Sequence, residues 1–202
     1  MNTADLLGAM SEALRGDGHE VRELRLYDLD FKGCRGCFSC KRSGSRFYGC
    51  CAMKDGLTEP LSWLPEVEAI LLASPIYFGS VTGEMRSFLE RLLYPSLVYS
   101  SPTRSNFGRN LPVGMVYTMN VSEATFRSHP MKAHLEATEG SIARIFGRPP
   151  KSFFAFETNQ LKDYSGVEYT YADPEARLRR HQEVWPSELS RARAFARELL
   201  AA

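Results

Sequence analysis

The sequence predicts an α/β protein with a doubly wound parallel sheet, in which helices cover both faces and form three layers. Two observations carry this prediction. Helical and strand-like segments alternate along most of the 202 residues, and such alternation is typical of a parallel sheet joined by crossover helices. In addition, residues 69–73 are apolar without interruption, as expected of a short strand that is buried on both faces.

Helices are predicted where apolar residues recur at the spacing of one helical face. The first covers residues 4–15. Asn2 or Thr3 can cap its start, and Gly16 with Gly18 can end it. Further helices are expected at residues 57–64, 85–93, 134–146 and 174–202.

Strands are expected between these helices, at residues 21–26, 69–73, 113–119 and 153–156. The first has Val21, Leu24 and Leu26 among charged residues, which suits an exposed sheet edge. The second is expected to end at Ser74 and Pro75. The predicted order begins with a helix, although a doubly wound sheet ordinarily begins with a strand.

Composition indicates an ordinary globular protein. The 25 Lys and Arg residues nearly balance the 24 Asp and Glu residues, for a net charge of +1, so neither nucleic acid nor a membrane is an expected partner. No apolar run approaches the ~20 residues of a membrane span. The first 16 residues lack the features of a signal peptide, so a cytoplasmic location is expected. We expect one domain over residues 1–202, with a helical tail from about residue 174 that is interrupted at Pro186.

Ligands of open α/β sheets bind beyond the carboxyl ends of the strands. Residues 74–80 and 118–120 are expected there. In the first segment, Ile76, Tyr77 and Phe78 form an apolar loop that a flat, largely apolar ring would cover. The alternative is that Tyr77 and Phe78 pack under the helix that follows.

The start of the chain is the third segment expected at this edge. Asn2 and Thr3 lie at a predicted helix N-terminus, where free N–H groups and the helix dipole favour a phosphate. The candidate cofactor-binding residues are therefore Asn2, Thr3, Ser74, Pro75, Ile76, Tyr77, Phe78, Gly79, Thr118, Met119 and Asn120.

All five cysteines are confined to one short segment. Cys34, Cys37 and Cys40 have the spacing C-x2-C-x2-C, and Cys50 and Cys51 follow. Three such thiols can converge on one site with Cys50 or Cys51 as a fourth ligand, and four cysteines hold zinc or an iron–sulfur cluster. We take Cys34, Cys37, Cys40 and Cys50 as candidate metal ligands. The alternative is a loop of reduced cysteines without metal.

No catalytic side chain is predicted. The four histidines form no recognisable pairing with a carboxylate or a nucleophile. Arg177, Arg179 and Arg180 are interpreted as a solvated helix face rather than a nucleic-acid patch.

The chain resembles the NADPH-dependent FMN reductase group of flavodoxin-like proteins, which includes the iron–sulfur flavoproteins. The resemblance rests on residues 74–91, Ser-Pro-Ile-Tyr-Phe-Gly-Ser-Val-Thr-Gly-Glu-Met-Arg-Ser-Phe-Leu-Glu-Arg. It also includes the cysteine spacing, residues 54–57 and residues 117–120. It covers most of the chain from Asn2 to about Asn159.

The resemblance implies a sheet of strand order 2-1-3-4-5 with FMN bound where the order reverses. Residues 75–79 would contact the flavin ring, and residues 118–120 would line its other side. The family's phosphate loop follows the first strand and ends in Asn-Thr, which Asn2 and Thr3 match. The first strand and the rest of the loop have no counterpart here, so we expect the natural reading frame to begin further upstream.

The function expected from this resemblance is FMN-dependent oxidoreduction, in which NAD(P)H passes a hydride to FMN and a quinone or another small molecule accepts the electrons. A second hypothesis is an electron-transfer protein with a [4Fe–4S] cluster on the cysteines. A third is a scaffold that binds no flavin. A homodimer or homotetramer is expected, with residues 94–110 and the tail around Trp185 as candidate contacts.

Overall fold

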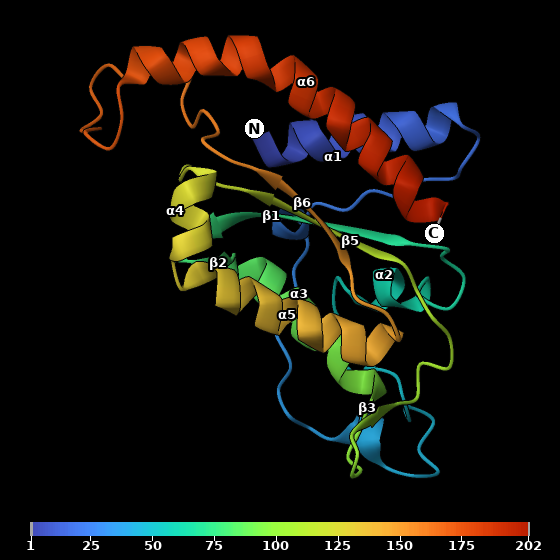
Figure 1. The fold of residues 1–202 in the computed structure, drawn as a ribbon. Coiled ribbons are helices and arrows are strands. Elements are labelled where there is room, and N and C mark those ends of the chain that lie inside the picture. Colours follow the sequence, from blue (N-terminus) through green and yellow to red (C-terminus); the bar gives the residue numbers. More distant parts are fainter. Residues whose placement is uncertain (1, 202) are drawn as a thin grey trace.

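A four-stranded sheet forms the centre of the protein in the computed structural model, which describes residues 2–201 (Figure 1). Its strand order is β2-β1-β5-β6. The strands are β1 Ile70–Tyr77, β2 Ser80–Val81, β5 Val113–Thr118 and β6 Lys151–Ala155. β1, β5 and β6 are parallel, whereas β2 is a short antiparallel addition to the end of β1. Met1 and Ala202, the ends of the expected domain, lie outside the described residues.

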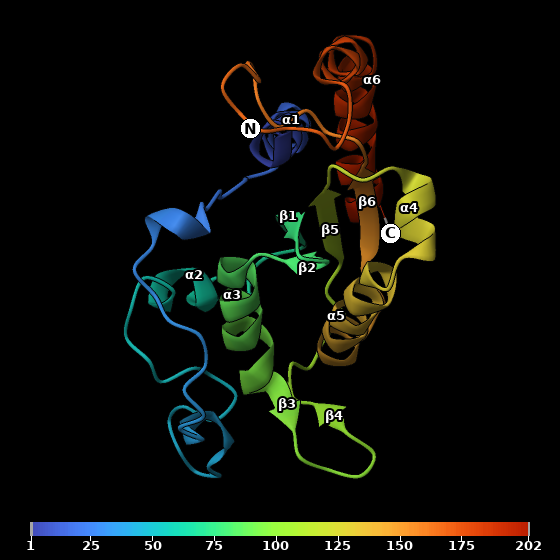
Figure 2. The same ribbon diagram turned by 90° about the vertical axis from the view of Figure 1, so that its left-hand side faces the viewer.

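Helices cover both faces of the sheet, which confirms the predicted three-layer α/β fold (Figures 1 and 2). α1 and α6 lie on one face, and α3 and α5 lie on the other. The helices are α1 Asn2–Gly16, α2 Thr58–Ser62, α3 Gly83–Leu93, α4 Glu123–Ser128, α5 Met131–Phe146 and α6 Pro174–Leu200. The short α4 is not predicted from the sequence. None of the helices within residues 2–201 combines the length and hydrophobicity of a membrane span.

Shorter elements complete the chain. They are the 3-10 helices Leu26–Asp28, Ser39–Lys41 and Tyr94–Ser96, and the hairpin strands β3 Leu97–Val98 and β4 Arg104–Ser105. Neither β3 nor β4 is among the strands predicted from the sequence.

β5 is the most buried strand, since all six of its residues are buried. Its side chains alternate between the core beneath α3 and α5 and the core beneath α1 and α6. Gly114 lets α6 approach closely: a Cβ there would lie 2.6 Å from Leu71 Cδ2 and 3.0 Å from Leu199 Cδ2. Only a residue without a side chain fits between the strand and the helix at this point.

β1 has one paired edge and one largely open edge. The N–H of Ile70 donates to the C=O of Pro112 at 3.0 Å, so alternate residues from Ile70 onward face β5. The backbone groups of Leu71 and Ala73 therefore face the other edge. Within residues 2–201 that edge is paired only with β2, at the last two residues of β1.

The strand expected at residues 21–26 does not form. This segment runs without a ladder partner into the 3-10 helix Leu26–Asp28. Its charged side chains pair locally instead, as in the bond from Arg22 Nε to Glu20 Oε1 at 2.8 Å. The physical reason is that a strand needs a neighbour, and no strand in the described chain lies between this segment and β1.

The sequence predicts that this strand ends at Ser74 and Pro75, and this prediction is wrong. β1 continues to Tyr77. Pro75 occupies the register position opposite Thr118. By the alternation above, its missing N–H would face the open edge rather than β5. A proline at such a position removes no ladder hydrogen bond, so the strand tolerates it.

The predicted interruption of the C-terminal helix at Pro186 is wrong. α6 is one continuous helix from Pro174 to Leu200, with Pro186 inside it. Trp185, Ala192 and Ala196 on the same helix are buried against α1 and the sheet. Burial of this apolar face on both sides of the proline stabilises the helix despite the lost backbone bond.

One-sided pairing predicts an alternating pattern of amide exchange along β1. We expect the N–H groups of Leu71 and Ala73 to exchange with solvent deuterium at least tenfold faster than those of Leu72 and Ser74, because only the latter pair with β5. Hydrogen-exchange NMR measures each amide directly. Equal protection of all four amides would show that the open edge is paired in solution.

Candidate functional site

The start of α1 lies against the carboxyl ends of the strands. Thr3 Oγ1 is 2.6 Å from Thr118 Oγ1 at the end of β5, and Asn2 Nδ2 donates to Asn159 O at 2.6 Å. Because the helix begins at Asn2, neither side chain serves as the predicted helix cap. Both instead join the N-terminus of α1 to segments more than 100 residues away.

The connection from β1 to β2 is a two-residue turn with unusual backbone geometry. Phe78 has φ 50° and Gly79 has φ 77°, as a type I′ hairpin requires at its two central residues. Phenylalanine is costly in this conformation, by about 1–2 kcal/mol. The side chain of Phe78 is fully exposed and that of Tyr77 is 57% exposed, so the alternative in which both pack under the next helix is wrong.

Ser74 is buried and supports this hairpin from inside. Its Oγ donates to the C=O of Pro75 at 2.8 Å and accepts from the N–H of Thr82 at 3.1 Å. Thr82 in turn caps α3, since its Oγ1 accepts from the N–H of Met85. Ser74 therefore fixes the turn relative to α3 and is not among the residues that line the adjacent cavity.

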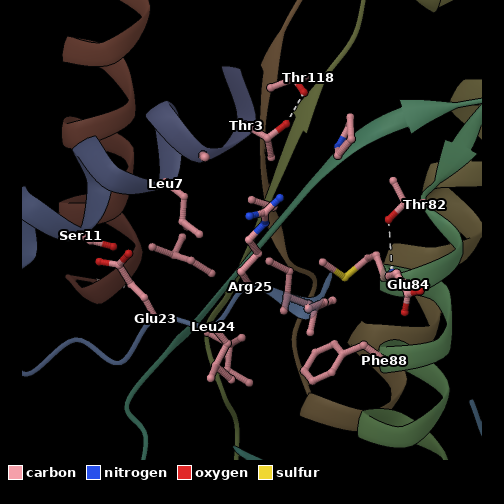
Figure 3. A pocket seen from close by; sticks show the side chains of 18 of the residues that line it. Thr3, Leu7, Ser11, Glu23, Leu24, Arg25, Thr82, Glu84, Phe88 and Thr118 are labelled. Atoms are coloured by element: carbon pink, nitrogen blue, oxygen red, sulfur yellow. Dashed lines mark hydrogen bonds between the residues drawn. The ribbon is translucent and has the colours of Figure 1, made fainter. Parts of the chain in front are cut away.

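A cavity of about 1670 Å³ opens at the carboxyl edge of the sheet (Figure 3). Ten of the eleven sequence-predicted residues line it. They are Asn2, Thr3, Pro75, Ile76, Tyr77, Phe78, Gly79, Thr118, Met119 and Asn120. The structure thus brings together three segments that are far apart in the sequence.

The same cavity continues along the open edge of β1. Figure 3 shows Leu7 of α1 on one side of this groove, Leu24 on another and Phe88 of α3 below. Small-molecule pockets usually measure about 300–1,000 Å³. The cavity exceeds this range because it combines a pocket at the carboxyl edge with the groove beside β1.

The sequence reasoning missed the loop after β6. Thr158, Asn159 and Gln160 also line the cavity. Thr158 Oγ1 donates to the C=O of Met119 at 3.2 Å, which joins this loop to the one after β5. The rule that ligands bind beyond the carboxyl ends of parallel strands would have found these residues, had it been applied to the fourth expected strand.

The cysteines gather at a different place, beside the end of α3. Cys34, Cys37, Cys40 and Cys51 line a hollow of about 10 Å³, whereas the predicted ligand Cys50 is exposed and does not line it. Among residues 2–201, no three Cys, His, Asp or Glu side chains are arranged to hold a metal ion. As placed, the thiols of the described residues therefore do not form a metal site, and all five are free.

The cysteine thiols differ in their surroundings. Hydrogen bonds from Ser39 lower the pKa of the Cys37 thiol, while burial raises the pKa of the Cys40 thiol despite the neighbouring Lys41. Lys41 Nζ donates to the carbonyls of Pro95 at 3.1 Å and Leu97 at 2.5 Å, which ties this loop to the chain after α3.

Arg91 on α3 fastens the cysteine loop to the core. Its side chain is 1% exposed. Its guanidinium donates to both carboxylate oxygens of Asp55, at 2.6 and 3.1 Å, to the C=O of Lys32 at 2.8 Å and to Cys51 Sγ at 3.1 Å. Hydrogen bonding from Arg91 lowers the pKa of Asp55.

Comparison with known proteins finds one matching protein family and several related sequences. A family model described as NADPH-dependent FMN reductase matches residues 2–138. An iron-sulfur flavoprotein of Archaeoglobus fulgidus is 34% identical over 90 residues, which are 45% of this chain and 42% of that protein. Another, of Methanocaldococcus jannaschii, is 29% identical over 121 residues, 60% of this chain and 56% of that protein. The chain spans about half the length of these curated relatives.

Solved structures share the fold at low sequence identity. An NAD(P)H:quinone oxidoreductase from Methanothermobacter marburgensis has a TM-score of 0.69 and 14% identity, over 98% of this chain and 92% of that one. An FMN-dependent NADH-azoreductase from Bacillus anthracis, in complex with FMN, has a TM-score of 0.60 and 9% identity, over 97% and 92% of the two chains. These similarities confirm the predicted flavodoxin-like fold.

The buried pair predicts a strong coupling between Arg91 and Asp55. Replacing Asp55 by Ala leaves the Arg91 charge buried without its partner, and we expect the free energy of unfolding at pH 7 to fall by about 3–5 kcal/mol. The double variant Asp55→Ala with Arg91→Met should lose less than the sum of the two single losses. Urea unfolding of all four proteins measures this coupling, and additive losses would contradict it.

The same pair predicts the direction of the pH dependence. Because the folded pKa of Asp55 is lowered, its contribution is present above its unfolded pKa of about 3.9 and is lost as the pH falls through the folded value. The stability difference between wild type and Asp55→Asn should therefore shrink in acid.

Proposed function

Because the chain belongs to the NADPH-dependent FMN reductase family, we propose that it is an oxidoreductase that binds FMN at the carboxyl edge of its sheet. Electrons from NAD(P)H then reach a quinone or another small acceptor. The observation that carries this proposal is the convergence of the β1–β2 hairpin, the loop after β5 and the start of α1 on one cavity.

The residues around the cavity fit the parts of FMN. Tyr77 and Phe78 offer apolar surface to a flat ring. Thr118, Met119 and Asn120 line the cavity from the end of the neighbouring strand β5 and the loop after it, and Asn120 offers polar groups there. The N-terminus of α1, beside Thr3, offers free N–H groups and a positive dipole end to a phosphate.

The chemistry that bound FMN supplies is acceptance of a hydride from NAD(P)H and delivery of the electrons to an acceptor. The chain's own residues bind and orient. Ser74 holds the hairpin against α3, so that the turn at Phe78 keeps its position. The apolar hairpin residues exclude water from one side of the cavity.

Small-molecule acceptors suit the solved structures that share this fold, among them a quinone oxidoreductase and an azoreductase. We also propose that the protein works in the cytoplasm, in keeping with its five free cysteines. A homodimer or homotetramer would cover Phe78, which is fully exposed in the single chain.

The direct test is FMN uptake, followed by turnover. Titration of the purified protein with FMN, monitored by flavin fluorescence, should show saturable binding. Oxidation of NADH or NADPH should then depend on both FMN and a soluble quinone. Absence of binding at FMN concentrations up to about 1 mM would contradict the proposal. A dissociation constant of about 1 mM corresponds to a binding free energy near −4 kcal/mol.

Phe78→Asn sharpens this test. Asparagine accepts the left-handed conformation more readily than phenylalanine, so the variant should be more stable to urea by about 1 kcal/mol. Its FMN affinity should nevertheless fall about tenfold, because the aromatic surface is lost. Tyr171→Asn is the matched control, since Tyr171 is exposed and lies outside the cavity lining. If Phe78→Asn binds FMN as tightly as wild type, Phe78 is not part of the flavin site.

An iron–sulfur cluster is the second candidate cofactor. It is favoured by the names of the relatives and by the four thiols of Cys34, Cys37, Cys40 and Cys51 around one hollow. The hollow of about 10 Å³ would have to open to admit a cluster.

Iron and sulfide content after anaerobic reconstitution tests this second candidate. Cys51→Ser should reduce the iron content, whereas Cys50→Ser should leave it unchanged, because only Cys51 lies beside the other three thiols. Iron bound equally by wild type and by both variants would exclude this ligand set.

A further inference from the structure

The loop after β5 is held by a distant part of the chain. The C=O of Met119 accepts from the N–H of Thr158 at 3.0 Å and from its Oγ1 at 3.2 Å. The C=O of Val121 accepts from the N–H of Glu157 at 3.0 Å. Glu157 has φ 52°, an unusual value for this residue type. The loop after β6 therefore binds the first and third carbonyls of residues 119–121.

The carbonyl between them is bound by Arg177, at the start of α6. Arg177 Nη2 donates to the C=O of Asn120 at 3.0 Å, and Arg177 Nη1 lies 3.3 Å from Glu157 Oε1. Arg177 is only 6% exposed, so the interpretation of residues 177–180 as a solvated helix face is wrong for this residue. One buried guanidinium thus joins the two loops.

All three carbonyls of residues 119–121 accept hydrogen bonds, whereas two N–H groups of this loop do not donate to the described part of the protein. Within residues 2–201, the N–H groups of Asn120 and Val121 have no acceptor. Both residues line the cavity. A ligand with acceptor atoms, such as the carbonyl edge of a flavin, would satisfy these donors.

We propose that Arg177 is a positioning residue, which holds the carbonyls of residues 119–121 away from the cavity and so presents the N–H groups of Asn120 and Val121 to the acceptor edge of the flavin. This inference rests on the proposed function. Arg177 itself lies outside the family match, which ends at residue 138.

The surroundings of Arg177 keep it in place. Arg180, one turn further along α6, lies 3.5 Å from the second oxygen of Glu157 and 3.5 Å from Glu188 Oε1. Glu188 is 4% exposed. The first half of α6 extends past the carboxyl ends of the strands (Figure 1). This ionic row therefore anchors that half of the helix over the loop that Arg177 binds.

Arg177→Met tests the proposal, because methionine keeps part of the apolar volume and removes both contacts. Arg179→Met is the matched control, since Arg179 lies on the same helix, is 59% exposed and, within residues 2–201, forms ion pairs only with Asp173 and Glu175. Arg177→Lys retains the positive charge on a single donor nitrogen, and should restore part of the effect.

The first readout needs no flavin. In Arg177→Met, exchange of the Glu157 and Thr158 amides should accelerate about tenfold, while the amide of Met115 in β5 keeps its wild-type rate. Unchanged exchange at Glu157 and Thr158 would overturn the proposal. An equal acceleration at Met115 would also overturn it, because Arg177 would then act on global stability alone.

The second readout is the flavin itself. Arg177→Met should raise the FMN dissociation constant about tenfold and make the flavin reduction potential more negative, because the presented N–H groups stabilise the charge gained on reduction. Arg179→Met should stay within twofold of wild type. A wild-type affinity and potential in Arg177→Met would overturn the proposal. If wild type takes up no FMN, the proposed function fails, and the exchange experiment still decides whether Arg177 holds the loop.

Discussion

The pairing of β1 with β5 is the interaction on which the rest of the structure depends. β1 has no other neighbour along most of its length within residues 2–201, so its register against β5 alone fixes where the strand ends. The hairpin at Phe78 continues directly from β1, and the loop of Met119 and Asn120 continues directly from β5. Because both strands run in the same direction, one register brings both loops to one cavity.

The carboxyl edge is held by segments that are remote in the sequence. Asn2 contacts the loop after β6, Thr3 contacts the end of β5, and Arg177 contacts the loop after β5. Each contact joins backbone or side-chain groups of a loop to a helix whose own position is fixed by packing on the sheet. The loops therefore gain rigidity from α1 and α6, which pack against each other on one face (Figure 2).

The cysteine loop has little regular structure of its own, so its position depends on contacts with the core. Arg91 supplies its anchor, because a guanidinium offers five donors and here binds a carboxylate, a carbonyl and a thiol at once. Burial makes this arrangement sensitive to loss of the carboxylate: without Asp55, the Arg91 charge remains in a poorly solvated place without an ionic partner. The loop's distance from the hairpin site means that the two sets of residues can be varied separately.

The sequence by itself determined the elements whose signals are local. Apolar periodicity located α1, α3 and α5, and an apolar run located β1. Of the eleven cofactor-binding residues predicted from the sequence, ten line the cavity. Tertiary structure decided what depends on a neighbour. Residues 21–26 have a strand-like pattern but no partner, Pro75 is tolerated because its side of β1 is open, and Cys51 rather than Cys50 joins the other thiols beside Arg91. Pairing, burial and long-range hydrogen bonds are properties of two segments together, and no local pattern contains them.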